Sequence, residues 1–229
     1  MDGPTVRALL RHASTASLAT LDAITGHPYA SLVEVATMPD ARPILLLSGL
    51  ARHTRNLKAD PRASLLVDQR HAGDSPLATE RATIIGRVTA TNDATARRRY
   101  LARHPAAEQF ASFGDFGFWL LEIDRAHGIA GFGRIREVAG SDVGLPVSVA
   151  ASFTAVEEEI IARVNQRLAM LSTTTGHSLC TATGVDPEGI DYRVSARPVR
   201  KPMRVQIAGI ETCVEAILYA LRAVPPALA

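Results

Sequence analysis

Hydrophobic and polar residues alternate in six short runs in the first part of the chain, at 17–21, 29–36, 43–48, 62–67, 81–90 and 117–123. A period of two predicts strands. The turn sequences ITGHP at 24–28 and MPDARP at 38–43 join the first runs so tightly that these strands must be antiparallel. The pattern therefore predicts a mainly β fold, a small barrel.

Three segments between or before these runs have helical features. Residues 4–12 begin with a proline and place Val6, Leu9 and Leu10 on one side. Residues 53–59 end at an Asp-Pro pair, and residues 92–104 end before Pro105. We predict three short helices that accompany the barrel.

A change of pattern divides the chain near residue 139. Residues 139–152 are small, contain glycine and proline and lack a helical stripe, so we assign them as a linker between a domain at 1–138 and a domain at 153–229. After the linker, Thr154 and Glu157 resemble a capping box, and apolar residues then recur at helical spacing. The turn sequence DPEG at 186–189 separates two strand-like runs, and a final helix follows. The second domain is predicted to be a small α+β domain.

Charge and cysteine content exclude several classes of partner. The 25 basic and 23 acidic residues are interspersed and give a net charge of +2, so neither nucleic acid nor an anionic membrane is favoured. No apolar run reaches the ~20 residues of a membrane-spanning helix, and the start lacks the pattern of a signal peptide. Cys180 and Cys213 are too few for a disulfide framework. We expect a soluble, cytoplasmic protein.

Familiar catalytic signatures are missing. The glycines of GIAGFGRI at 128–135 lack the GxGxxG spacing of dinucleotide folds, and there is no Walker loop and no GxSxG elbow. The seven histidines form no HExxH pair. A zinc protease or an α/β-hydrolase is therefore not expected, and no residue is assigned as a catalytic acid or base.

The segment LLLSGLARHTRNL at 45–57 carries the densest polar chemistry. A leucine-rich strand leads through Ser48 into the start of a helix that bears Arg52, His53, Thr54 and Asn56. Free helical N–H groups and forked guanidinium donors suit an anion such as phosphate or carboxylate. The alternative is a solvated helical face, with Thr54 and Asn56 serving only as caps.

Several longer segments resemble one known family. SLATLDAITGHPYASLVEVA (17–36), ILLLSGLARHTRNLKADPRASLLV (44–67), RATIIGRV (81–88) and DFGFWLLEIDRAHGIAGFGR (115–134) are similar to the FMN-binding split barrels of the pyridoxamine 5'-phosphate oxidase-like superfamily. The resemblance is closest to its haem-utilisation branch. GVDPEGIDYRVSARPVRKPM at 184–203 is similar to the small α/β domain that commonly follows the barrel there.

This resemblance implies a homodimer that binds its cofactor at the subunit interface. The phosphate of FMN would be held by Arg52, His53, Thr54 and Asn56, with Ser48 near it and Ser31 beside the flavin ring. The matched GFGR segment adds Arg134 as a cofactor contact, and Trp119 and Phe132 could wall the slot. An aromatic residue in an alternating strand is, however, ordinarily part of the core.

The sequence departs from the family pattern at two places. His53 stands where flavin enzymes usually carry a lysine, and the HMNxDH motif of many haem-utilisation relatives is replaced by RVNQRL at 163–168, which keeps only Asn165. Haem would need an apolar cleft, basic groups and an axial ligand. His53, His127 and His177 are the candidates, and His127 is the one that we predict as the iron ligand.

Three functions stay open at this point. The first is a haem-binding protein of the haem-utilisation type, with a link to haem degradation by an oxygenase. The second is an FMN-dependent oxidoreductase that resembles pyridoxamine 5'-phosphate oxidase. The third is a cofactor-free interaction module, because fold alone does not determine function.

Overall fold

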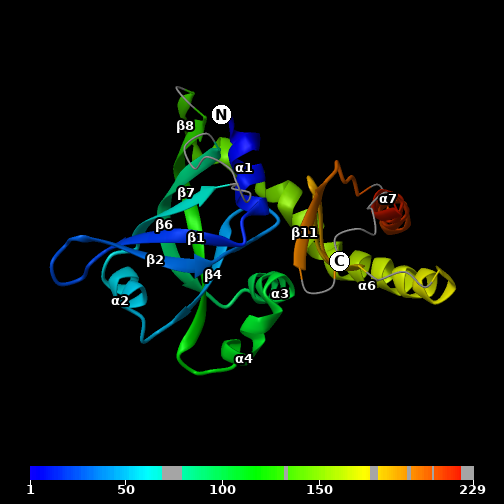
Figure 1. Cartoon of the computed structure of the whole chain (residues 1–229), viewed down its shortest axis with the longest axis horizontal. Coiled ribbons are helices and arrows are strands. Elements are labelled where there is room, and N and C mark those ends of the chain that lie inside the picture. Colours follow the sequence, from blue (N-terminus) through cyan, green and yellow to red (C-terminus); the bar gives the residue numbers. More distant parts are fainter. Residues whose placement is uncertain (69–78, 132–133, 176–179, 195–196, 208, 223–229) are drawn as a thin grey trace. The chain divides into compact units, whose positions relative to one another are not determined.

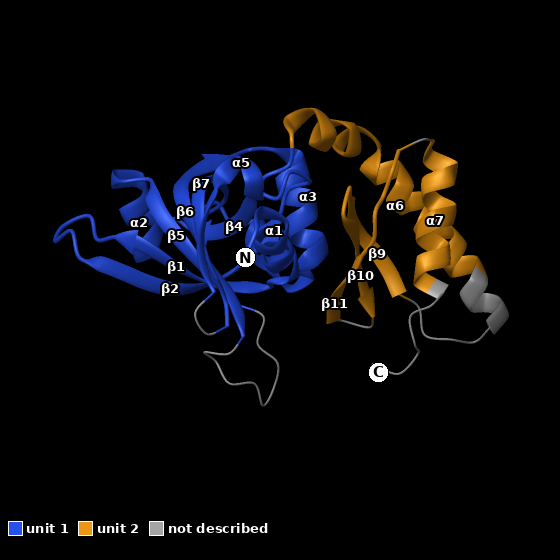
Figure 2. Cartoon of the chain, turned by 90° about the horizontal axis from the view of Figure 1, so that it is seen from above, with its two compact units in different colours: residues 1–145 blue, residues 146–229 orange. Residues whose placement is uncertain are grey.

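The computed structural model describes residues 1–68, 79–131, 134–175, 180–194, 197–207 and 209–222. The chain forms two compact units, Met1–Leu145 and Pro146–Ala229, coloured separately in Figure 2. The division falls within the predicted linker at 139–152, but most of that segment is not irregular. It contains the short helix α5 (Gly140–Val143) and the first turns of the long helix α6 (Val147–Thr175).

The first unit is built on one curled antiparallel sheet (Figure 1). Its strands lie in the order β2-β1-β5-β6-β7-β4-β3, and β8 pairs with β7. This arrangement confirms the predicted split barrel. The strands are β1 (Thr15–Leu21), β2 (Pro28–Glu34), β3 (Ala36–Thr37), β4 (Pro43–Ser48), β5 (Arg62–Asp68), β6 (Glu80–Thr91), β7 (Phe116–Ala130) and β8 (Ile135–Ala139).

Short helices close the barrel and connect its strands. They are α1 (Gly3–His12), α2 (Arg52–Ala59), α3 (Ala94–Arg103), the 3-10 turn η1 (Pro105–Ala107) and α4 (Glu108–Ala111). Asp2 caps α1 by accepting a 3.0 Å hydrogen bond from the backbone N–H of Thr5. α1 buries Val6, Leu9 and Leu10, the stripe that the sequence predicts. Helix α2 packs beside β1 and β2 (Figure 1).

Alternation fixes which face of the sheet forms the core. In β5, Ala63, Leu65 and Val67 are buried and join the main apolar cluster, while Leu66 points to the other face and is 41% exposed. Trp119 is also part of this cluster and is buried, as a core aromatic residue would be.

A bulge in the pairing of β6 with β7 changes which residues of the two strands lie opposite each other on its two sides. The register shifts between Ile85 and Gly86, and a Cβ atom at Gly86 would lie 1.8 Å from the backbone oxygen of Glu122. Only glycine permits this approach of the two backbones. Beyond the bulge β7 continues to Ala130 and turns into β8, whereas the sequence predicts a strand that ends at residue 123 and no strand after it.

The second unit is a three-stranded antiparallel sheet covered by two helices. Its strands β9 (Cys180–Asp186), β10 (Gly189–Val194) and β11 (Arg197–Pro202) lie in the order β11-β10-β9, and α6 and α7 (Ile210–Arg222) lie on one side of them (Figure 2). A separate apolar cluster joins the helices to the sheet. The predicted helix, hairpin, strand and helix are all present.

The predicted start of the long helix is wrong. Helix α6 begins at Val147, so Thr154 is inside it, and its hydroxyl donates to the backbone oxygen of Ala150 at 3.1 Å. Glu157 is fully buried and accepts a 3.0 Å hydrogen bond from the backbone N–H of Val185. The pair is therefore not a capping box, and Glu157 ties the helix to β9.

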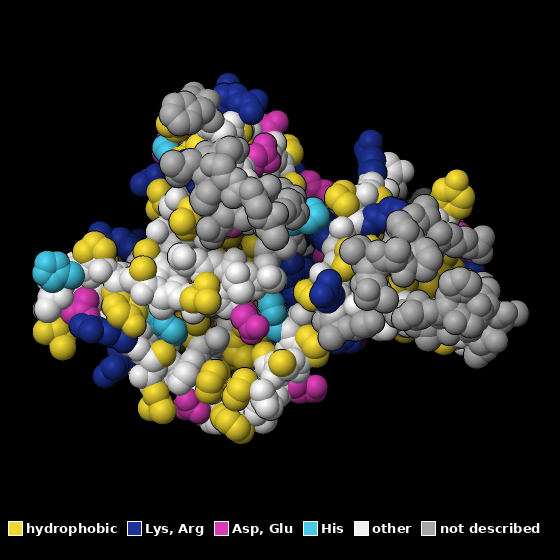
Figure 3. Space-filling view, viewed as in Figure 1, with side chains coloured by type: hydrophobic (Ala, Val, Ile, Leu, Met, Phe, Trp, Pro, Cys, Tyr) yellow, Lys and Arg dark blue, Asp and Glu magenta, His cyan; other side chains and the backbone are white. Residues whose placement is uncertain are grey.

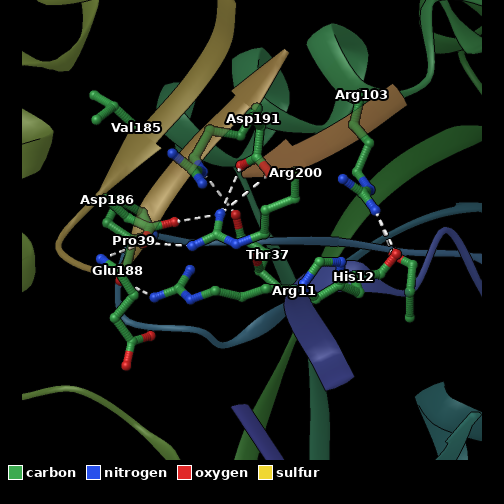
Figure 4. Close-up of polar contacts among 12 residues, drawn as sticks. Arg11, His12, Thr37, Pro39, Arg103, Val185, Asp186, Glu188, Asp191 and Arg200 are labelled. Atoms are coloured by element: carbon green, nitrogen blue, oxygen red, sulfur yellow. Dashed lines mark hydrogen bonds and ion pairs between the residues drawn. The ribbon is translucent and has the colours of Figure 1, made fainter. Parts of the chain in front are cut away.

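A buried ion-pair cluster holds the DPEG hairpin. Arg200 on β11 donates two hydrogen bonds to Asp186, at 2.8 and 2.9 Å (Figure 4). It also donates to both carboxylate oxygens of Asp191, each at 3.1 Å. Both Arg200 and Asp186 are almost fully buried. The side chain of Arg200 therefore ties the strand β11 to both ends of the turn between β9 and β10.

Arginines of α3 stabilise the first unit in a similar way. Arg99 is buried and donates to the backbone oxygen of Thr37 at 2.7 Å. Arg103 donates to the backbone oxygen of His12 at 2.9 Å (Figure 4). These side chains connect α3 to other segments of the barrel. Part of the arginine-rich sequence at 97–103 is therefore used for packing.

Candidate functional site

The helix α2, which the sequence predicts as an anion site, has its leading arginine paired with a carboxylate. Arg52 donates through Nε and through a terminal nitrogen to Asp22, each at 2.8 Å. Asp22 also accepts from the hydroxyl and the backbone N–H of Thr25, at 2.8 and 3.0 Å. The hydrogen bonds from Thr25, joined by that from Arg52, hold the pKa of Asp22 well below its usual value. The charge of Arg52 is thus compensated within the chain.

His53 faces the strand β2 rather than solvent. Its Nδ1 lies 3.1 Å from the hydroxyl oxygen of Ser31, and the imidazole is half-buried. Burial lowers the pKa of His53 below its usual value, so the ring is neutral at pH 7. The structure therefore brings together two of the predicted cofactor residues, Ser31 and His53, as a neutral pair.

Asn56 has a structural position under the turn between β1 and β2. Its side-chain nitrogen donates to the hydroxyl of Thr20 at 3.0 Å, and its side-chain oxygen accepts from the backbone N–H of Ala23 at 3.0 Å. Asn56 is 1% exposed, so it presents no polar atom to a ligand from outside. Its amide fixes α2 against the turn that supplies Asp22.

Thr54 and Ser48 also differ from simple helix caps. The residue at the N-cap of α2 is Ala51, so neither Thr54 nor Asn56 caps the helix. Thr54 is buried, and its hydroxyl has no hydrogen-bond partner among the described residues. Ser48 donates to Asp115 at 2.7 Å and accepts from the backbone N–H of Leu50 at 3.2 Å, so it stabilises the turn before the helix.

His127 lies at a second place, on the strand β7. Its Nδ1 is 2.9 Å from a carboxylate oxygen of Glu137 on β8, and 38% of the imidazole is exposed. The two residues pair directly across the hairpin. Arg125 lies near the same carboxylate, with Nε 3.9 Å from its second oxygen. This histidine–carboxylate pair is open to solvent.

The sheet separates the two places. One cross-strand row runs from Ser31 through Leu18, Leu65 and Ile84 to Ala126, so the side chains of this row point to the face that forms the core. His127 follows Ala126 and points to the opposite face. Within one chain, Ser31 and His127 therefore cannot contact the same side of one cofactor.

The face that carries His127 exposes large apolar side chains among polar ones. Leu32 is 76% exposed there and Leu66 is 41% exposed. A shallow concavity of about 330 Å³ lies on β1, β5 and β6, between Pro28, Ser64 and Ile85. Antiparallel sheets with one solvated face usually carry polar residues on it. We call this surface, from Leu32 on β2 to His127 on β7, the outer sheet face.

The remaining predicted residues lie elsewhere or outside the described part. Trp119 is buried in the core and does not line an open slot. Arg134 is exposed beside the β7–β8 connection and donates to the backbone oxygen of Ala130 at 2.9 Å. Phe132 and His177 fall outside the described residues. The residues predicted to hold one cofactor thus fall into separate groups.

Charges on the visible surface are distributed singly. On the side of the molecule that Figure 3 shows, basic, acidic and hydrophobic side chains of the described residues are interspersed, without an extended tract of one charge sign. Among the described residues, no group of three acidic, histidine or cysteine side chains could hold a metal ion, and no helix is long and apolar enough to span a membrane. Cys180 and Cys213 are free thiols.

Comparison with known proteins places the barrel in a family. Residues 3–130, which are more than half of the chain, match the pyridoxamine 5'-phosphate oxidase family. The chain belongs to this family. The resemblance that the sequence predicts is thereby confirmed for the barrel.

Individual relatives match different fractions of this chain. The chloroplastic heme oxygenase HOZ of Arabidopsis thaliana is 39% identical over 100 residues, which are 42% of this chain but 30% of that protein. A crystal structure of a protein of unknown function from Agrobacterium tumefaciens is 28% identical, covers 93% of this chain and 94% of its own, and has a TM-score of 0.74. A heme binding protein from Mycobacterium smegmatis is 24% identical, covers 97% and 98%, and has a TM-score of 0.59, which shows a shared fold.

Sequence analysis missed two carboxylates, Asp22 beside Arg52 and Glu137 beside His127. Asp22 lies two residues before the turn sequence predicted at 24–28, and the spacing of Asp22 and Thr25 is the signal of an Asx-type turn. Glu137 lies ten positions beyond His127, and only the unpredicted hairpin brings them together. The pairs Asp22–Arg52 and His127–Glu137 themselves have no local sequence signature.

Proposed function

We propose that this chain is a haem-binding protein of the haem-utilisation type, linked to haem degradation. The 39% identity to a protein named as a heme oxygenase supports this assignment over 100 residues. Because the chain spans about 30% of the length of that relative, the oxygenase activity itself is part of the proposal. Free Cys180 and Cys213 suit the reducing cytoplasm that the sequence predicts.

The pairing of Arg52 with Asp22 carries the preference for haem over FMN. A phosphate monoester has a charge of about −1.5 to −2 at neutral pH and needs uncompensated donors. In α2 the first guanidinium is taken by a carboxylate, and His53 is neutral because burial lowers its pKa. Of the residues that the resemblance assigns to the phosphate of FMN, neither Arg52 nor His53 therefore offers an uncompensated positive charge.

The outer sheet face has the chemistry that haem requires. A porphyrin is broad and apolar and carries two propionates, and this face offers exposed leucines, an accessible imidazole at His127 and a guanidinium at Arg125. When bound, haem would supply an iron centre able to bind oxygen. The chain itself would supply the apolar bed, the anchoring of the propionates and the exclusion of water.

A second copy of the chain is proposed as the partner. The outer sheet face exposes Leu32 and Leu66, whose apolar surface is costly to leave in water. A homodimer that covers this face would bury both leucines and would enclose a cofactor between the subunits. Neither a nucleic acid nor a membrane is proposed as a partner.

An FMN-dependent oxidoreductase is the second candidate. The family description itself supports it. The contact of His53 with Ser31, beside the start of an eight-residue helix, also gives a phosphate some polar neighbours. If neither haem nor FMN binds, a cofactor-free interaction module becomes the assignment.

Binding of FMN to two variants separates these candidates. Asp22→Asn removes the compensating charge from Arg52, so we expect FMN to bind about tenfold more tightly than to the wild type. Arg52→Ala should leave haem binding unchanged. Fluorescence quenching of FMN and the haemin Soret band provide the two readouts. Tight FMN binding by the wild type, lost in Arg52→Ala, would establish the flavoprotein instead.

A further inference from the structure

The His127–Glu137 pair has the arrangement of a metal-binding histidine and its supporting carboxylate. Histidines that bind a metal usually donate their second ring N–H to a carboxylate or carbonyl, which fixes the tautomer and increases the basicity of the ligating nitrogen. Here Nδ1 lies 2.9 Å from Glu137, so Nε2 is the nitrogen left to accept a metal. We infer that Nε2 of His127 ligates the haem iron and that Glu137 is its positioning residue. This inference rests on the proposed haem function.

The backbone makes this pair rigid. His127 and Glu137 are directly opposed in the antiparallel pairing of β7 with β8, and both side chains project to the outer sheet face. Sites held by strands are positioned more accurately than sites on loops. The short contact is therefore set by the register of the hairpin and needs no ligand to form it.

The neighbours of His127 provide an apolar bed. Ile129 precedes the turn on the same strand face, and Ile135 lies opposite it on β8 and is 60% exposed. On the other side, Thr83 pairs with His127 and Ile85 follows it on the same face of β6. A flat macrocycle that met the imidazole would cover these side chains, whose exposure is otherwise unfavourable.

Arg125 lies where it could bind a propionate. It is two residues before His127 on the same face, its side chain is 57% exposed, and its Nε is 3.9 Å from a carboxylate oxygen of Glu137. That separation is too long for a hydrogen bond, so the forked donors can still bind a second carboxylate. The surface thus combines an axial ligand, an apolar bed and a basic anchor.

Other described histidines are less suited to this role. His104 is 7% exposed, and its Nε2 contacts the backbone oxygen of Val35 at 2.9 Å. His53 contacts the hydroxyl of Ser31 and is half-buried. His27 is exposed in the turn before β2 and serves as a matched control for a histidine on the surface.

The test compares haemin binding by the full-length wild type, His127→Ala, His127→Gly, Glu137→Gln and His27→Ala. We expect His127→Ala to weaken haemin binding by at least tenfold, and Glu137→Gln by about tenfold, as is typical for the carboxylate behind a metal-binding histidine. Imidazole added to His127→Gly should restore the wild-type Soret spectrum. His27→Ala should behave as the wild type.

A spectroscopic readout separates a positioning role for Glu137 from a merely structural one. Loss of the carboxylate makes the imidazole less anionic, so the iron–histidine stretching frequency of the ferrous protein should fall in Glu137→Gln, and the midpoint potential should rise. A stretch that does not move would overturn the role of Glu137. Haemin dimethyl ester should bind more weakly than haemin to the wild type and equally to Arg125→Ala.

The outcomes distinguish the two levels of the proposal. If the wild type binds haemin saturably and His127→Ala binds it equally well with an unchanged spectrum, the ligand assignment is wrong while haem binding stands. If the wild type does not bind haemin, both the proposed function and the ligand assignment fail. Circular dichroism of each variant shows that a loss of binding is not a loss of fold.

Discussion

The carboxylate of Asp22 pairs with the guanidinium of Arg52 at 2.8 Å across 30 positions of the chain. This contact compensates the first positive charge of α2, the helix that the sequence predicts as an anion site. A single carboxylate in a tight turn thus compensates the guanidinium that leads this helix.

Removal of the Asn56 amide should destabilise the first unit. In Asn56→Ala the hydroxyl of Thr20 and the backbone N–H of Ala23 lose their partner in a buried place, which costs about 1–3 kcal/mol. Urea unfolding monitored by tryptophan fluorescence would measure this change in the free energy of unfolding. The exposed neighbour gives the control: Arg55→Ala should change stability by less than about 0.5 kcal/mol. Equal effects of both substitutions would contradict the structural role of Asn56.

Gly86 should not tolerate a side chain. In Gly86→Ala the added Cβ would lie 1.8 Å from the backbone oxygen of Glu122, so the bulge must open, at a cost of about 3 kcal/mol or more. Gly114→Ala is the matched control, because a Cβ there meets nothing within 4 Å. The two melting temperatures measure the difference. A Gly86→Ala protein as stable as the control would mean that the strands pair differently.

The second unit should depend on Arg200. Its loss leaves the buried carboxylate of Asp186 without its guanidinium, and breaking such a pair typically costs about 3–5 kcal/mol. Hydrogen exchange of the β10 amides would show faster opening in Arg200→Ala. Arg197→Ala, on the exposed start of β11, should leave exchange unchanged. Protection that survives in Arg200→Ala would contradict this account.

Stability should fall as the pH decreases below the usual pKa of histidine. Burial lowers the pKa of His104 from 6.5, so the unfolded chain binds a proton more readily than the folded chain. The contribution of neutral His104 to the free energy of unfolding is complete above pH 6.5. It is lost as the pH falls from there towards the lower pKa of the folded state. Unfolding free energies at pH 7.5 and 5.5 should differ less in His104→Asn. An identical pH dependence in both proteins would exclude His104 as the cause.

The outer sheet face should hold two chains together. Leu32→Asp places a charge on the most exposed leucine of that face, so we expect the variant to be monomeric under conditions in which the wild type is dimeric. Light scattering coupled to size-exclusion chromatography measures both masses. Ile24→Asp, which changes an exposed residue at the tip of the β1–β2 turn, is the control. A wild-type monomer would contradict the proposed homodimer.

Local patterns were sufficient to predict most of the barrel. Strict alternation in segments such as β5 identifies strands because one face of each must be buried, and the Asp60-Pro61 pair ends α2 where the sequence indicates. The start of α6 was missed because residues 147–152 read VSVAAS, which carries no amphipathic stripe. Phe153 is buried in the apolar cluster of the second unit, and helices in proteins are stabilised mainly by such packing, which local propensity does not reveal.

The candidate site was predictable only in part. Ser31 and His53 do lie together, yet no spacing in the sequence reveals that Asp22 pairs with Arg52. Likewise, His127 could be singled out as a histidine, but its carboxylate depends on a hairpin register that alternation did not predict. Long-range pairing decides the charge of a site, and one sequence does not contain it explicitly.

The most direct test of the central claim is a side-by-side absorption titration of the purified wild-type protein with haemin and with FMN. The account predicts a saturable Soret shift at about one haemin per chain, with micromolar or tighter affinity, and FMN binding at least tenfold weaker. A two-band flavin spectrum that saturates while the Soret band stays that of free haemin would contradict it.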